Sequence, residues 1–215
     1  MFILLIFFGK GLYMEFIEKI SEGKYKIKSE ESTRKYLIQT CKYFNILESF
    51  SDDIIINVNS VGGIEDEFKI KQEELKITKF IYCIGLQMLI LLELNLSIKY
   101  FDEYDFIYVN KDIFLFVNYN KLFSLLTKDK FKEKTKFIDY KYGIINNVNE
   151  SNKFLSPEVK RGDKIIYYTN MYYSFALLIQ KIFDFKIEDI YYTKTYFFLE
   201  RCLKDNPFER EFMYV

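Results

Sequence analysis

The sequence contains no histidine and no tryptophan among its 215 residues. Serine–histidine and cysteine–histidine catalysis need an imidazole, and so do metal sites with histidine ligands, so these classes of site are excluded. Cysteine is scarce as well, because only Cys41, Cys83 and Cys202 are present. Three scattered cysteines are too few for a zinc site of four thiolates. We expect them to be reduced core residues, as in an intracellular protein.

Neither sign of charge is in excess, because 31 Lys and Arg residues balance 31 Asp and Glu residues. A neutral chain gives no reason to expect a nucleic-acid-binding surface. The apolar residues 1–8 lack the basic start and cleavage site of a signal peptide, and residues 80–92 are too short to span a bilayer comfortably. The sequence therefore predicts a soluble, cytoplasmic protein with neither nucleic acid nor a membrane as a partner.

Half of the residues are hydrophobic, and 19 tyrosines and 23 phenylalanines account for many of them. A chain of this length and composition can bury one sizeable core, or form two small lobes that share a cleft. Residues 80–96 and 167–183 are apolar around most of the circumference of a helix, which indicates buried helices. Residues 107–109 and 113–117 are short apolar runs separated by Asn-Lys-Asp, which predicts a hairpin.

The other segments predict smaller elements. Strand patterns occur in residues 1–28, 46–50 and 53–58. Helical spacing occurs in residues 29–45 and 193–203. Residues 65–79 and 122–136 are charged stretches, which are expected to be exposed to solvent. The helix in 29–45 is expected to have Ser29 or Ser32 as its N-cap. The sequence thus predicts an α+β chain, with strands in its first part and helices in its second.

Several motifs occur in the order in which they occur in protein kinases. FLSPEVK at 154–160 resembles the Ala-Pro-Glu element that closes the activation segment, and MYYSFALLI at 171–179 resembles the helix after it. RCLKDNPFERE at 201–211 resembles the closing pattern of the kinase domain. Residues 94–120 are similar, with one apparent deletion, to the catalytic loop, hairpin and metal-binding triplet. Residues 44–68 are similar to the stretch from the end of helix αC to the hinge.

The resemblance implies a two-lobed kinase-like fold. Residues 1–61 would form a reduced, β-rich N-lobe, and residues 62–215 would form a mainly helical C-lobe. Together they would make one domain, with the predicted helices 80–96 and 167–183 at the centre of the C-lobe. The composition favours a comparison with kinase-like proteins of large DNA viruses, which would place the chain in the cytoplasm of a host cell. The alternative is an unrelated intracellular α+β domain whose motifs match by coincidence.

The phosphate-binding residues of a kinase are only partly retained. Gly9 and Gly11 match the first two glycines of the Gly-rich loop, but Met14 takes the third place, where a side chain would crowd the backbone that approaches phosphate. Lys28 matches the lysine that binds phosphate, although it could equally be a solvated lysine at a strand end. The glutamate that pairs with this lysine in kinases cannot be assigned, because Glu30 and Glu31 lie too near in sequence.

The catalytic loop and the metal-binding triplet are also changed. Asp102 keeps the place of the catalytic base, but Tyr100 and Phe101 replace the histidine and arginine before it. The asparagine that holds one metal ion aligns with Phe106, and the aspartate of the triplet is replaced by Asn118. Since an amide is a poor ligand for Mg²⁺, both metal positions are expected to be impaired. A cleft lined there by two or more carboxylates would instead favour an enzyme.

The residues that stabilise a kinase fold are better preserved. Glu158 and Arg210 match the pair that joins the activation segment to the end of the C-lobe, and we expect a partly buried, bidentate contact between them. The alternative is a solvated arginine near the C-terminus. Met171 stands where a buried aspartate normally supports the catalytic loop, so aromatic packing is expected to replace that polar support.

The resemblance leads to two functional hypotheses. The first is a catalytically impaired kinase-like protein that acts by binding a protein partner, with no cofactor assigned. The alternative is a divergent Ser/Thr kinase that transfers the γ-phosphate of ATP with Mg²⁺, using Lys28, Asp102 and Asn118.

Overall fold

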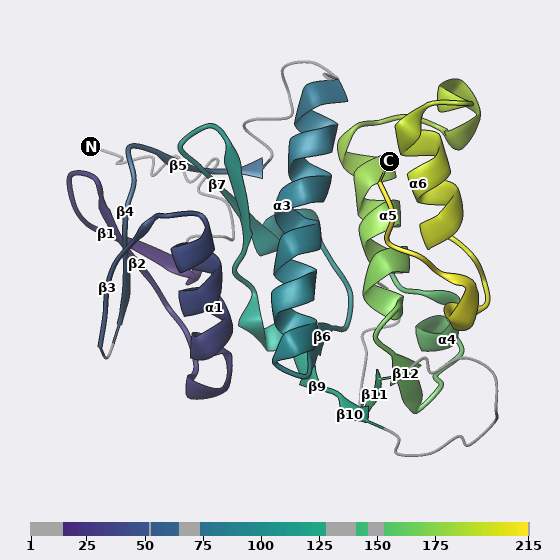
Figure 1. Ribbon diagram of the computed structural model, residues 1–215, viewed down its shortest axis with the longest axis horizontal. Coiled ribbons are helices and arrows are strands. Elements are labelled where there is room, and N and C mark those ends of the chain that lie inside the picture. Colours follow the sequence, from purple (N-terminus) through teal and green to yellow (C-terminus); the bar gives the residue numbers. More distant parts are fainter. Residues whose placement is uncertain (1–14, 52, 65–73, 128–140, 146–152, 215) are drawn as a thin grey trace, which may run out of the picture.

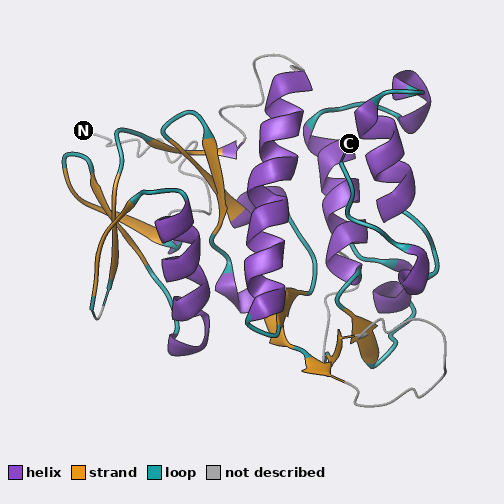
Figure 2. Cartoon of the chain, in the orientation of Figure 1, coloured by secondary structure: helices purple, strands orange, loops and turns teal. Residues whose placement is uncertain are grey.

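The computed structural model describes residues 15–51, 53–64, 74–127, 141–145 and 153–214. In these residues the chain forms small antiparallel sheets and helices, arranged roughly in chain order across the molecule (Figure 1). A sheet with its own helix lies at the N-terminal end, and most of the other helices lie at the opposite end (Figure 2). Gly9, Gly11 and Met14 lie outside the described residues, so the expected Gly-rich loop is not described.

The N-terminal sheet has four antiparallel strands in the order β1-β2-β4-β3. The strands are β1 (Ile17–Ser21), β2 (Lys24–Ile27), β3 (Leu47–Phe50) and β4 (Ile54–Asn57). Ile27, Ile54 and Ile56 are buried with side chains of helix α1 (Glu31–Tyr43) in one core. The N-cap of α1 is Glu30, so the prediction of Ser29 or Ser32 was wrong.

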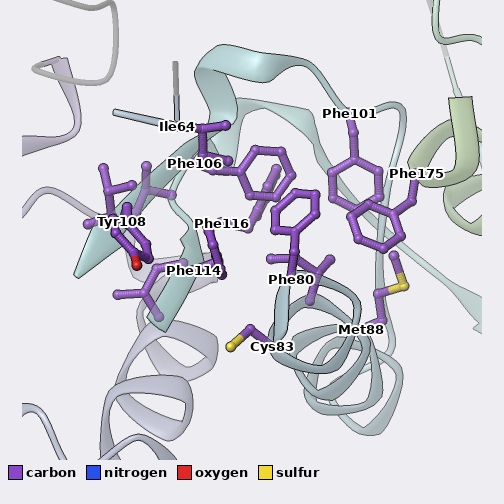
Figure 3. Close-up of a cluster of buried hydrophobic side chains, with 14 of the residues drawn as sticks. Ile64, Phe80, Cys83, Met88, Phe101, Phe106, Tyr108, Phe114, Phe116 and Phe175 are labelled. Atoms are coloured by element: carbon purple, nitrogen blue, oxygen red, sulfur yellow. The ribbon is translucent and has the colours of Figure 1, made fainter. Parts of the chain in front are cut away.

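The centre of the molecule is the long helix α3 (Glu74–Glu93). It packs against a three-stranded sheet, of order β5-β7-β8, that consists of β5 (Val61–Gly63), β7 (Phe106–Val109) and β8 (Ile113–Phe116). The Phe80 ring lies within 5.0–5.4 Å, between ring centres, of Phe106, Phe114 and Phe175 (Figure 3). Edge-on and tilted pairs at this spacing add to the stability gained by burial.

The remaining elements form the C-terminal part. Its strands are β6 (Leu96–Ile98), β9 (Leu122–Ser124), β10 (Leu126–Thr127), β11 (Lys141–Ile144) and β12 (Ile165–Tyr167). Its helices are α4 (Pro157–Lys160), α5 (Asn170–Ile182) and α6 (Lys194–Cys202). Short 3₁₀ turns complete it: η2 (Glu103–Asp105), η3 (Tyr119–Lys121), η4 (Ile187–Ile190) and η5 (Pro207–Glu209).

A buried hydrogen-bond network joins the N-terminal sheet region to the rest. Tyr36, on α1, donates from its hydroxyl to Oε1 of Gln87, on α3, over 2.9 Å. The same oxygen accepts from the backbone N–H of Phe116, and Nε2 of Gln87 donates to the carbonyl oxygens of Cys83 and Phe114. Both α1 and α3 contribute to one continuous hydrophobic core.

The predicted division into residues 1–61 and 62–215 cuts through β5. Gly62 and Gly63 pair with Tyr108 and Ile107 of β7, so the whole of β5 belongs to the second part. The predicted buried helices are present as α3 and α5, although α3 begins earlier, at Glu74. The segment 122–136 was expected to be solvated, but its described residues form β9 and β10.

Helix α3 is also the one helix in the described residues that is long and apolar enough to cross a membrane. The stretch Leu75–Glu93 meets that criterion, and half of it is buried inside the protein. The core helices of soluble proteins meet the same criterion. The three cysteines are buried and unbonded to one another, as the sequence predicts.

Candidate functional site

A cleft of about 350 Å³ lies where the N-terminal sheet region meets the acidic loop after β6. Three short segments supply its lining residues, which are Glu15, Phe16, Tyr100, Asp102, Tyr104, Asp105, Asn118, Asn120 and Lys121. Phe16 also contacts Tyr119 edge-on, with 5.7 Å between ring centres, and this contact bridges the two parts of the molecule. The cleft therefore contains Asp102 and Asn118, two of the residues singled out from the sequence.

Asp105 is the most buried acidic group of the cleft, with 1% of its surface exposed. Its Oδ1 accepts a hydrogen bond of 2.7 Å from Nδ2 of Asn118. Its Oδ2 accepts from Nζ of Lys121 at 2.8 Å and from the backbone N–H of Asp102 at 2.6 Å. Both carboxylate oxygens are thus bonded to groups of the protein itself.

Burial raises the pKa of Asp105 to about 6, because the ionised carboxylate is removed from water. The Lys121 ammonium opposes this shift through its charge and its hydrogen bond, and the Asn118 hydrogen bond opposes it further. The charge of Asp102 acts in the other direction and raises the pKa of Asp105. The ion pair with Lys121 therefore only partly offsets the cost of burying this carboxylate.

Lys121 is a cation held inside the cleft. Its side chain is 12% exposed. Besides its contact with Asp105, its Nζ lies 4.2 Å from the ring centre of Tyr100. An ammonium over an aromatic face is attracted by the electrons of the ring, and more strongly where water is excluded. The cleft thus stabilises a positive charge by a carboxylate on one side and an aromatic ring on the other.

Polar side chains of α5 hold the loop that carries Asp102. Ser174 accepts a hydrogen bond of 2.7 Å from the backbone N–H of Phe101. Nδ2 of Asn170 donates to the carbonyl oxygens of Ile98 and Lys99. Neighbours of Met171 on α5 therefore supply polar support to the loop, in addition to the aromatic packing that we expected.

Aromatic packing in the core supports the same loop. The Phe101 ring lies 5.6 Å from Phe106, 5.6 Å from Phe116 and 5.4 Å from Phe175, between ring centres. Phe106 is fully buried in this cluster and points into the core (Figure 3). The prediction that Phe106 faces the metal-binding region was wrong. Asp105, the residue before it, lines the cleft instead, because it ends the 3₁₀ turn η2, whereas Phe106 begins strand β7, which is buried throughout.

The cleft is richer in carboxylates than we expected. Glu15, Asp102 and Asp105 all line it, whereas the sequence led us to expect two impaired metal positions. Among the described residues, however, no group of three or more acidic or cysteine side chains is arranged to hold a metal ion. Because both oxygens of Asp105 are already bonded to protein donors, the residues present do not fit a Mg²⁺ site.

Lys28 lies at the end of β2, exposed, and is not a lining residue of the cleft. The lining thus includes Asp102 and Asn118 but not Lys28, whose backbone N–H donates to the carbonyl oxygen of the lining residue Phe16 over 2.9 Å. The alternative interpretation of Lys28, as a solvated lysine at a strand end, agrees with this position.

Glu158 and Arg210 form the contact expected from the sequence. Nη1 and Nη2 of Arg210 donate to Oε1 and Oε2 of Glu158 over 2.5 and 2.7 Å. Arg210 also donates to the carbonyl oxygens of Lys204 and Asp205, and its guanidinium lies 4.9 Å from the ring centre of Tyr173. Both side chains are buried, so this pair connects α4 to the C-terminal segment inside the protein.

No model of a known protein family matches this chain, and no curated protein sequence matches it. The resemblance to protein kinases therefore rests on the motifs themselves.

Several residues of the cleft were not singled out from the sequence, namely Glu15, Phe16, Tyr104, Asp105 and Lys121. Asp105 and Lys121 carried a usable signal, because each lies within three residues of a position that had been singled out. A carboxylate and a lysine beside such positions can pair across the loop. Glu15 and Phe16 reach the cleft only through the folding of the N-terminal sheet, and no local pattern shows this.

The pH dependence of stability provides a test of the buried Asp105. Its pKa is about 6 in the folded protein and near the ordinary 3.8 when unfolded, so the folded state binds the proton more tightly. The stability that the folded protein gains from binding this proton more tightly is fully present below about pH 4, and it is lost as the pH rises through about 6. Relative to Asp105→Asn, the wild type should therefore lose stability over this interval, by at most about 3 kcal/mol.

Urea unfolding of both proteins from pH 4 to pH 7 measures this difference directly. The asparagine variant keeps a hydrogen-bonding side chain of the same shape, and the amide of Asn118 can turn over to match it. Asp163→Asn, at an exposed ion pair with Arg161, serves as the control for removing a carboxylate. Parallel curves for the wild type and Asp105→Asn would show that Asp105 titrates normally.

Proposed function

We propose that this chain is a kinase-like protein that binds a protein partner and does not transfer phosphate efficiently. The observation that carries the proposal is the state of Asp105. Its two oxygens are bonded to Asn118, Lys121 and the backbone of Asp102, and one of these donors is a positive charge. A carboxylate that is neutralised in this way is a poor ligand for a divalent cation.

Phosphoryl transfer depends on neutralising the charge of the β- and γ-phosphates while the reacting groups are held in line. Metal ions and a lysine normally supply that neutralisation. In the cleft, an amide at Asn118 replaces a carboxylate and Lys121 is committed to Asp105. Lys28, the other candidate cation, is not a lining residue. The described residues therefore offer a triphosphate little positive charge.

The kinase-like part of the proposal is supported by the pair Glu158 and Arg210. These two residues are 52 positions apart in the sequence, and the resemblance alone led us to expect the contact. This pair supports the proposed fold and says nothing of activity, because neither residue lines the cleft. A stable fold in which the Asp105 carboxylate is already paired with Lys121 suits the recognition of another protein better than catalysis.

A divergent Ser/Thr kinase is the second candidate, and one observation favours it. Three carboxylates line the cleft, including Asp102 at the position of the catalytic base. For Asp105 to bind a metal ion, Lys121 would have to leave it, so activity would require a rearrangement of this ion pair.

Transfer of radiolabelled γ-phosphate, with Mg²⁺ and with Mn²⁺, tests the proposal. We expect incorporation at the background level, in the protein itself and in generic substrates, and no change with Asp102→Asn or Lys28→Ala. A thermal-shift titration with ATP, with and without metal, should show little stabilisation, since a bound ligand raises the unfolding temperature by mass action. Robust incorporation that both substitutions abolish would establish the enzyme instead. Lys24→Ala, at the start of the strand that ends just before Lys28, is the matched control.

A further inference from the structure

We infer that two copies of this chain pair through the exposed side of helix α3, with the two helices antiparallel. The residues of this side follow one another in alternating steps of four and three positions, and we call them the α3 seam: Leu75, Lys79, Tyr82, Leu86, Leu89 and Glu93. The inference goes beyond the proposed function and does not depend on it, because none of these residues lines the cleft. It follows from three features of the α3 seam, which are its exposure, its spacing and the order of its charges.

The middle of the α3 seam is apolar and open to solvent. Leu75, Tyr82 and Leu89 are 64%, 60% and 59% exposed, and Leu86 is partly exposed. Tyr43, at the end of α1, enlarges this surface, because it is 54% exposed and its hydroxyl lies 3.2 Å from that of Tyr82. Large apolar side chains gathered on one exposed face indicate a surface that another molecule covers.

The spacing of the α3 seam is that of a helix that packs along another helix. Alternating steps of four and three residues keep side chains on one side of an α-helix, as in a coiled coil. From Leu75 to Glu93 the seam is about 27 Å long, or roughly five turns. The opposite side of α3 is covered within the chain, where Phe80 packs against Phe106 and Phe175. Since α1 and α5 lie on either side of α3 (Figure 1), the seam is the side that remains for a partner.

The order of the charges along the α3 seam favours a second copy as the partner. Lys79 lies toward one end and Glu93 at the other, and no charged residue lies between them in the sequence. Antiparallel pairing places Lys79 of each copy beside Glu93 of the other, and Tyr82 of each copy then meets Leu86 of the other. Parallel pairing would instead bring like charges together, which is unfavourable. The seam is thus complementary to itself, as a twofold interface requires.

The ion pair between Lys79 and Asp112 is compatible with this contact. Both side chains are exposed, and an ammonium has three donors, so Lys79 can bind Asp112 of its own chain and Glu93 of the second copy together. A lipid surface is a poorer occupant, because membrane-bound helices carry several basic residues beside their apolar face and the α3 seam has one. A standard interface buries about 800 Å² on each partner, and one helix face supplies only part of that area. We therefore expect a weak dimer, with a Kd of roughly 10–100 µM.

Sedimentation equilibrium of the full-length chain, from about 5 to about 500 µM, measures dimerisation around the expected Kd. Lys79→Glu and Glu93→Lys each turn both attractive contacts of the dimer into repulsive ones. A mixture of these two variants makes both contacts attractive again. Tyr82→Lys places a charge in the apolar middle of the α3 seam, and Tyr192→Lys, at a tyrosine that is 86% exposed, is the matched control. Urea unfolding of each variant establishes that it is folded.

We expect each charge reversal to weaken dimerisation roughly tenfold or more, and the mixture to restore it to within about threefold of the wild type. Tyr82→Lys should abolish the dimer, and Tyr192→Lys should leave it unchanged. A chain that stays monomeric over the whole range, or a mixture that pairs no better than its components, would overturn the inference. Co-sedimentation of a monomeric chain with vesicles of phosphatidylcholine and phosphatidylserine, abolished by Tyr82→Lys, would identify a lipid surface instead. Either result would leave the proposed function standing, because phosphate transfer is measured separately.

Discussion

Replacing Arg210 with methionine is expected to lower the free energy of unfolding by about 3–5 kcal/mol, because Glu158 would be left as a buried charge without its partner. The two side chains meet through two parallel hydrogen bonds, and both are almost completely buried. The substitution also removes the donors to the carbonyl oxygens of Lys204 and Asp205. Methionine has a similar length, so the loss reflects charge and hydrogen bonding more than volume.

Urea unfolding of the wild type and the variant measures this loss. Arg161→Met is the control, because Arg161 is exposed and pairs only at the surface with Asp163. A surface ion pair contributes about 0–1 kcal/mol, so the control should be nearly neutral. The double variant Glu158→Leu/Arg210→Met should be less destabilised than Arg210→Met alone, since no buried charge is then stranded. A loss in Arg210→Met no larger than in Arg161→Met would contradict the buried pair.

The substitution Gln87→Leu is expected to lower the free energy of unfolding by a similar amount, roughly 2–6 kcal/mol, because it leaves buried polar groups without partners. The amide of Gln87 bonds to the hydroxyl of Tyr36, the N–H of Phe116 and the carbonyl oxygens of Cys83 and Phe114. Leucine fills nearly the same space and satisfies none of them. Tyr36 keeps its contact of 3.4 Å with the carbonyl oxygen of Phe116, and the carbonyl of Cys83 keeps its hydrogen bond within α3. The N–H of Phe116 and the carbonyl of Phe114 are therefore the groups left without a partner, and each costs about 1–3 kcal/mol.

The reciprocal substitution on the same helix, Leu89→Gln, is the matched control. Leu89 is 59% exposed, and leucine and glutamine have similar helix propensities, so this change should lie within about 0.5 kcal/mol of the wild type. Tyr36→Phe removes only one of the four partners and should give an intermediate loss. If Gln87→Leu unfolds at the same urea concentration as Leu89→Gln, the network does not stabilise the fold.

The helices and hairpins could be predicted from the sequence because their signals are local. An apolar run around the whole circumference marks α3 and α5, and short β-branched and aromatic runs around Asn110 mark the hairpin of β7 and β8. The strands β9 and β10 could not be predicted, because they are short and lie in a lysine-rich stretch. Their stability comes from pairing with β6 and β11, which sequence periodicity does not show.

The candidate site was harder to predict, and the error at Phe106 shows why. A motif places a residue along the chain, but it does not show where the loop ends and the buried strand begins. A shift of one position therefore exchanged Asp105, the last residue of η2, which lines the cleft, for Phe106, the first residue of β7, which packs in the core. The ion pair between Asp105 and Lys121 depends on the turn at η3 and could be seen only in three dimensions.

The link between Tyr36 and Gln87 has a consequence for how the cleft receives a ligand. Since α1 is fastened to α3 inside a shared core, the N-terminal sheet region and the acidic loop keep fixed positions relative to each other. A side chain that enters between them loses its own rotational freedom, but the walls have little freedom left to lose. Most of the entropy lost on binding there is therefore lost by the ligand, which favours a partner whose contacting side chain is already rigid.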